Sequence, residues 1–153
     1  MSAEARLRER NIMIPASPRA VGNYVNAVQT GSLVFCSGHG PITGGVPMAR
    51  GKVGREVSME EGYRLAREVG LMLLGTLREE LGSLDRVTRI VKVLGMVSAA
   101  ENFHDLPKVI NGFSDLMIEV FGEQIGKHAR SAIGVAELPL GIPVEVEMIV
   151  EVK

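Results

Sequence analysis

Residues 128–153 read HARSAIGVAELPLGIPVEVEMIVEVK, and this closing stretch has the clearest structural pattern in the chain. From Val144 to Val152, apolar residues alternate with three glutamates and one isoleucine. A period of two is typical of a strand that buries one face. A further strand is expected from Arg130 to Ala136, and the turn Leu138–Pro143, which contains proline and glycine, predicts that the two strands form a hairpin.

Two amphipathic helices are expected upstream of this stretch. Ser58 and Glu61 form a capping box, and apolar residues follow at helical spacing, so we expect a helix over 58–81 that Gly82 closes. A second helix is expected from Asp105 to Phe121, because the proline near its start is tolerated in a first turn. Glycines inside the first helix cost about 1 kcal/mol each relative to alanine, which predicts a close approach to a sheet. They are Gly62, Gly70 and Gly75.

Hydrophobic runs predict the remaining strands. Tyr24–Gln29 and Leu33–Ser37 flank the tight turn Thr30–Gly31 and should form a hairpin. Gly51–Val57 is a further candidate strand, and Val87–Val97 is a long one rich in valine and isoleucine. Helices that alternate with strands of a mixed sheet predict an α+β fold, a two-layer sandwich with two main helices. The other face of such a sheet needs a cover, so a homo-oligomer is expected.

The composition fits one domain with a core of its own. The chain has 153 residues, of which 46% are hydrophobic and 23% are charged. We expect a single domain over residues 12–153, preceded by a polar and mobile segment at residues 1–11. A formal charge of −1 and 4% aromatic residues do not favour nucleic acid as a partner, and no apolar run is long enough to span a membrane. A single cysteine excludes an intrachain disulfide, and a cytoplasmic location is expected.

The cysteine and the histidines do not form a catalytic or metal-binding motif. His39, His104 and His128 lack the HxxxH and CxxC spacings, so no metal site is expected. Cys36 continues the apolar run Leu33–Phe35, which predicts a buried and unreactive thiol. The glycines of residues 38–45 lack the GK[ST] of a phosphate-binding loop, and we interpret them as turns.

Arg130 and Glu145 are the candidate chemical groups of the closing stretch. Arg130 stands among apolar residues at the start of a strand, and a guanidinium can hold a carboxylate through two parallel hydrogen bonds. A surface arginine or an interface ion pair would fit the same composition. Glu145 shares its polar face with Glu147 and Glu151, and spacing alone does not distinguish it from a solvated charge.

Short motifs follow one another in a characteristic order along the chain. They are Gly22-x-Tyr24, Ser37-Gly38, Asn111-Gly112-Phe113, Ala129-Arg130-Ser131, Val135-Ala136-x-Leu138-Pro139 and Val144-Glu145-Val146-Glu147. In this order they resemble the YjgF/RidA family, over nearly the whole chain. Members of that family are small trimeric proteins; many are deaminases of enamines and imines, and some carry the name endoribonuclease.

The resemblance implies a chorismate-mutase-like fold and a homotrimer with a site in each cleft between subunits. In that site Arg130 would bind the carboxylate of the substrate, and Glu145 would orient and deprotonate a water molecule. The pocket would be lined by Tyr24, Ser37, Gly38 and Asn111, some of them from the neighbouring subunit. The expected ligand is a small 2-imino or 2-keto carboxylate, and neither a metal nor an organic cofactor is expected.

These residue types suit the hydrolysis of an imine. A 2-imino acid carries an electrophilic C=N carbon beside a negative carboxylate, so anchoring the carboxylate positions that carbon and a general base activates the water. We therefore expect a cofactor-free enzyme that deaminates reactive 2-imino and enamino acids and so limits metabolite damage. Two alternatives stay open: a non-catalytic protein that binds a small carboxylate or keto acid, and an endoribonuclease, which the charge and the few aromatic residues disfavour.

Four positions depart from the family pattern. His39 stands where glutamine usually follows Ser-Gly, and His128 stands where proline usually precedes Ala-Arg. Ala132 replaces a common cysteine, and Phe113 replaces a frequent tyrosine. These departures change the expected lining of the pocket, so the sequence does not name the substrate.

Overall fold

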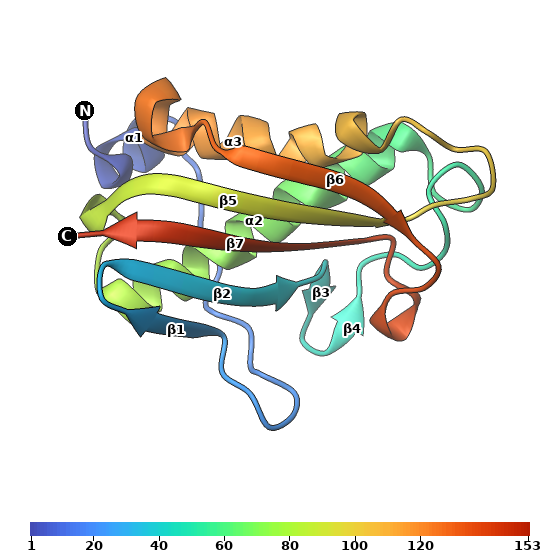
Figure 1. Ribbon diagram of the computed structural model, residues 1–153, viewed down its shortest axis with the longest axis horizontal. Helices are drawn as coiled ribbons and strands as arrows, with labels where there is room; N and C mark the ends of the chain where they lie inside the picture. The colour runs from blue at the N-terminus through green and yellow to red at the C-terminus, as the bar shows by residue number, and fades with distance from the viewer.

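The computed structural model describes residues 1–153 and has two layers, a mixed sheet and a pair of long helices (Figure 1). The main sheet has five strands in the order β1-β2-β7-β5-β6. These strands are β1 (Ala27–Thr30), β2 (Leu33–His39), β5 (Val87–Ser98), β6 (Ala129–Val135) and β7 (Val144–Val152). The helices are α1 (Ala3–Glu9), α2 (Met59–Leu81) and α3 (Leu106–Gly126), with short 3₁₀ turns η1 (Leu84–Arg86) and η2 (Pro139–Gly141). The predicted α+β sandwich with two main helices is confirmed.

The closing stretch does not form the expected hairpin. β5 lies between β6 and β7, parallel to β6 and antiparallel to β7. Because α3 connects β5 to β6, the chain returns beside β5 in the same direction, as helical crossovers do. The next segment then passes the end of β5, and β7 pairs with the edge of β5 that β6 leaves free. The other edge of β7 pairs with β2. The predicted alternation within β7 is confirmed, with its valines and Met148 buried.

α2 begins and ends where the sequence predicts. The Ser58 hydroxyl accepts a hydrogen bond from the amide of Glu61 at 3.1 Å, and Gly82 closes the helix in the left-handed conformation, with φ of 79°. The carboxylate of Glu61 accepts two hydrogen bonds from Arg64 instead of returning to the cap. Only half of the predicted capping box is therefore formed.

None of the three glycines of α2 approaches the sheet: Gly62 and Gly70 face α3, and Gly75 faces the backbone of Pro15. A Cβ placed at Gly70 would lie 2.7 Å from the side chain of Leu116 on α3. On α3 itself, a Cβ at Gly112 would collide with the backbone of Tyr63 on α2. The missing side chains let the two helices pack closely, and this packing offsets the cost of glycine within a helix.

The N-terminal segment is a helix packed on the domain, in place of the predicted mobile segment. Ser2 caps α1, and Leu7 is buried in the main core. Glu4 accepts two hydrogen bonds from Arg78 of α2, at 3.1 and 2.6 Å. Leu7 and the ion pair of Glu4 with Arg78 attach the helix to the domain, and the polar composition of the segment did not indicate either contact.

The strand predicted at Gly51–Val57 is absent, and β1 begins later than predicted. Val53 and Val57 are buried but form only isolated bridges. Their apolar character therefore reflects burial in a loop. Because β1 begins at Ala27, Tyr24 lies in the loop before it. Gly44 and Gly45 form the turn of a short hairpin between β3 (Ile42–Thr43) and β4 (Val46–Pro47).

The two long helices cover one face of the main sheet (Figure 1). Large apolar side chains remain exposed elsewhere on its strands, including Val28, Phe35 and Ile133. An apolar sheet face of this kind is typical of a contact with another protein chain. No helix has both the length and the apolar character that crossing a membrane requires.

Candidate functional site

Arg130 is the second residue of β6 and points toward α3. It is paired with Val93 of β5, and Val93 belongs to the buried face that the helices cover. The Nη1 group of Arg130 donates to Oδ1 of Asn111 at 2.8 Å and to Oγ of Ser114 at 3.1 Å. Asn111 and Ser114 are three residues apart on α3, so the helix presents both on one side. Arg130 forms no ion pair within the chain.

His128 completes what we name the arginine cluster, which consists of Asn111, Ser114, His128 and Arg130. Nε2 of His128 lies 2.9 Å from the Ser114 hydroxyl, and Nδ1 lies 2.6 Å from the Gly126 carbonyl. Burial lowers the pKa of His128, the Gly126 carbonyl raises it in part, and the charge of Arg130 lowers it again. The imidazole is therefore neutral at pH 7.

Glu145 lies on the opposite face of the sheet from Arg130. It is paired with Met96 of β5, whereas Arg130 is paired with Val93 of the same strand. Residues that are an odd number of positions apart on a strand point to opposite faces. Arg130 and Glu145 of one chain therefore do not meet, although both were predicted to act on one substrate.

The carboxylate of Glu145 lies against Gly38 of β2. A Cβ at Gly38 would come within 3.0 Å of Oε2 of Glu145. The carboxylate is half-buried and accepts no hydrogen bond within the chain. Burial raises the pKa of Glu145, and the like charge of Glu147 raises it further. A carboxylate with a raised pKa and free lone pairs is suited to accept a proton from water.

Ser37 precedes Gly38 on β2 and Tyr24 shares a cavity with Gly38, and we name Tyr24, Ser37, Gly38 and Glu145 the glutamate cluster. Tyr24 and Gly38 line an open cavity of about 600 Å³ between the loop before β1 and the β3–β4 hairpin. The Tyr24 hydroxyl accepts a hydrogen bond from the Val21 amide at 3.3 Å. The Ser37 hydroxyl donates to the Val25 carbonyl at 2.6 Å, which leaves its lone pairs available. The predicted site residues thus fall into two separate clusters.

His39 and Cys36 are directed into the fold. Nε2 of His39 lies 2.8 Å from the Thr76 hydroxyl of α2, and Nδ1 lies 2.7 Å from the Ser37 carbonyl. Burial lowers the pKa of His39, and hydrogen bonds to the backbone of Ser37 and Gly38 raise it in part. Burial and the charge of Glu80 raise the pKa of Cys36 to about 12, so the thiol stays protonated. The predicted burial of Cys36 is confirmed, and the raised pKa agrees with an unreactive thiol.

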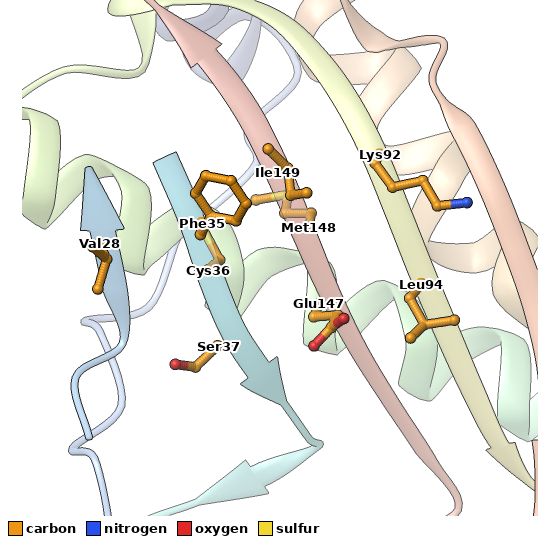
Figure 2. A pocket seen from close by; sticks show the side chains of 9 residues that line it. All are labelled: Val28, Phe35, Cys36, Ser37, Lys92, Leu94, Glu147, Met148 and Ile149. Atoms are coloured by element: carbon orange, nitrogen blue, oxygen red, sulfur yellow. The ribbon is translucent and has the colours of Figure 1, made fainter. Parts of the chain in front are cut away.

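A shallow pocket of about 390 Å³ lies on the uncovered face of the sheet, next to Ser37 (Figure 2). Its walls are mainly apolar, with Phe35 on β2 and Ile149 on β7. Figure 2 shows Lys92 extending away from Glu147, and its ammonium group donates to the Ser131 hydroxyl at 3.2 Å. The exposed apolar side chains of Val28 and Phe35 form part of its lining.

The sequence did not assign roles to Ser114 and His128. The spacing Asn111-x-x-Ser114 on a predicted helix places the two side chains one turn apart, and this spacing could have identified Ser114 as a second contact of the arginine. His128 was visible only as a departure from the family pattern. Its link to Ser114 depends on how the end of α3 turns into β6, and no local motif predicts that geometry.

Known proteins of similar sequence and structure match this chain over nearly its whole length. Residues 4–152 match the model of the YjgF/chorismate mutase-like family, whose description also names an endoribonuclease. Protein TCP17 of Trypanosoma cruzi is 38% identical over 149 residues, which cover 97% of this chain and 93% of that protein. A 2-iminobutanoate/2-iminopropanoate deaminase of Dermatophagoides farinae is 30% identical over 157 residues, covering 95% and 98%. The crystal structure of Atu1372 from Agrobacterium tumefaciens, a protein of unknown function, matches with a TM-score of 0.89 and 35% identity, covering 99% and 92%.

Proposed function

Because this chain belongs to the YjgF/chorismate mutase-like family, we propose that it hydrolyses small 2-imino or enamino acids to 2-keto acids and ammonia. The observation that carries this proposal is the pair of clusters. One presents a guanidinium without a carboxylate partner, and the other presents a carboxylate whose pKa is raised. The similarity to a 2-iminobutanoate/2-iminopropanoate deaminase supports the same reaction.

The proposed site forms between subunits of a homotrimer. Arg130 and Glu145 of one chain face away from each other across the sheet, so a site that uses both needs two copies of the chain. The exposed side chains of Val28 and Phe35 support a contact between copies through the sheet. In this assembly the arginine cluster of one subunit meets the glutamate cluster of its neighbour.

In the proposed reaction, Arg130 binds the carboxylate of the substrate and so places the C=N carbon in the cleft. Glu145 orients a water molecule and takes one of its protons as the oxygen attacks that carbon. The electron pair of the C=N bond moves to nitrogen, and Glu145 passes the proton it took to that nitrogen, which gives a neutral carbinolamine. Glu145 then takes the proton of the carbinolamine hydroxyl as the C=O bond forms, and transfers it to the nitrogen, which leaves as ammonia.

The test is ammonia release from 2-iminopropionate and 2-iminobutyrate generated in situ. We expect the wild type to exceed the spontaneous rate, and Arg130→Ala and Glu145→Ala each to lower kcat/KM by about 10²-fold or more. Arg64→Ala is the matched control, since it removes an exposed arginine paired with Glu61 at 2.6 Å. An Arg130→Ala variant with wild-type turnover would contradict the proposal.

A non-catalytic keto-acid-binding protein is the second candidate. The arginine cluster is complete within one chain and needs no water-activating group to hold a carboxylate. Saturable binding of 2-ketobutyrate by a wild type that does not accelerate imine hydrolysis would favour this candidate.

A further inference from the structure

A directed chain of hydrogen bonds links His128 to Arg130. The Gly126 carbonyl can only accept, so Nδ1 of His128 carries the proton at their 2.6 Å contact. In a neutral ring Nε2 is then an acceptor, and the Ser114 hydroxyl must donate its single hydrogen to it at 2.9 Å. The lone pairs of the Ser114 oxygen are thereby left to accept from Nη1 of Arg130 at 3.1 Å.

We propose that His128 is a positioning residue that orients the guanidinium of Arg130 through Ser114, an inference that rests on the proposed function. Asn111 and Ser114 both hold Nη1, whereas Nε and Nη2 make no hydrogen bond within the chain. Those two groups form one edge of the guanidinium, and this edge can bind both oxygens of a carboxylate.

The imidazole is itself held in place. Its Nδ1 is fixed by the backbone of Gly126, and its ring packs edge-on against Phe113, with centroids 6.3 Å apart and planes at 73°. A serine hydroxyl alone rotates freely and can turn its hydrogen toward Arg130, where two donors would oppose each other. A fixed acceptor at Nε2 of His128 disfavours that orientation of the serine hydroxyl, because the hydroxyl hydrogen is drawn to Nε2.

Three single variants and the double variant His128→Leu/Ser114→Ala test the chain of contacts, with 2-iminobutyrate as the substrate. His128→Leu removes the acceptor, and we expect KM to rise about tenfold with kcat nearly unchanged, because a carboxylate contact is made in both ground and transition states. His128→Gln keeps an oxygen acceptor and should restore most of the KM. Ser114→Ala should raise KM by a similar factor, and the double variant should be no worse than Ser114→Ala alone, since both changes break one chain. Independent, multiplying effects would overturn the proposal.

Three readouts that do not need turnover separate this proposal from the proposed function. In wild-type protein, long-range proton–nitrogen NMR should show His128 as the neutral Nδ1–H form, and an Nε2–H form would overturn the proposal. The Arg130 guanidinium signals should broaden in His128→Leu but not in His128→Gln; unchanged signals in both would overturn it. A wild type that hydrolyses no imine, but binds 2-ketobutyrate about tenfold more tightly than His128→Leu, would reject the hydrolase and keep the positioning role.

Discussion

The arginine and glutamate clusters differ in how completely one chain builds them. Arg130 is held by Asn111 and Ser114 of α3, and Ser114 is held in turn by His128. Glu145 accepts no hydrogen bond within the chain, and its carboxylate lies against Gly38, which has no side chain. The proposed anion-binding half is therefore preorganised, whereas the proposed proton-accepting half is left open.

This difference fits the demands of the two roles. A guanidinium binds a carboxylate most tightly when its free edge is already aimed, because less conformational entropy is lost on binding. A general base instead needs an available lone pair and a pKa near the working pH, and hydrogen bonds to the carboxylate would lower that pKa. Burial without partners raises the pKa of Glu145, as a base requires.

The strongest test of the comparison places the two clusters on different chains. Arg130→Ala and Glu145→Ala proteins should each be inactive, yet activity should return when they are unfolded together and refolded as mixed oligomers. With equal, random mixing, about a quarter of the intersubunit sites would combine an intact Arg130 with an intact Glu145. The measurement is the imine hydrolysis rate of the refolded mixture.

The control for mixing uses a double variant. A mixture of Arg130→Ala with Arg130→Ala/Glu145→Ala has no intact arginine cluster and should stay inactive. If the first mixture also stays inactive while its oligomers form, the site does not combine Arg130 and Glu145 from different subunits.

Local elements of this fold could be predicted from the sequence, whereas their placement in the sheet could not. The cap at Ser58, the end at Gly82 and the alternation of β7 depend on neighbouring residues, and all three predictions are confirmed. The position of β6 depends on the crossover through α3, which no short pattern reveals. A hairpin would have placed Arg130 and Glu145 on adjacent strands.

The candidate site follows the same division. Resemblance to a family identified Arg130, Glu145 and Asn111 by type and order. Arg130 and Glu145 lie on opposite faces because of the register of β5 with β6 and β7. This register is a property of the assembled sheet. Likewise, Leu7 could not be predicted as a core residue because its partners lie far along the chain.

A smaller effect is expected from Gly38→Ala, which changes the space beside the carboxylate of Glu145 and leaves the arginine cluster unchanged. The added Cβ would lie 3.0 Å from Oε2 of Glu145, so the carboxylate must shift by a few tenths of an ångström. Because catalysis is sensitive to the position of the base, kcat should fall by about tenfold while KM changes little. Gly134→Ala on β6 is the control, since its Cβ would meet ordinary contacts at 3.5 Å and beyond. Equal losses in both variants would show that the effect is not specific to Glu145.

The smallest expected effect is a displacement of the acid limb of the pH–rate profile. Glu145 must be ionised to accept a proton, so activity should fall as the pH drops through its raised pKa. Glu147→Gln removes the like charge, which lowers the pKa of Glu145 and should move the acid limb to lower pH without changing the rate on the plateau. The limb should still lie above that of an ordinary glutamate, because burial is the larger cause of the raised pKa.

Glu151→Gln is the matched control for this displacement. Glu151 is exposed like Glu147 and lies on the same face of β7, but farther from Glu145 and bonded to the Thr88 hydroxyl at 2.9 Å. Ionisation of the substrate is the same for all three proteins, so a difference between their profiles reports on the protein. If both variants shift the limb equally, a general change in charge is responsible. If neither variant shifts the limb, the group that titrates is not Glu145. The lack of hydrogen bonds to the Glu145 carboxylate would then not explain the pH dependence.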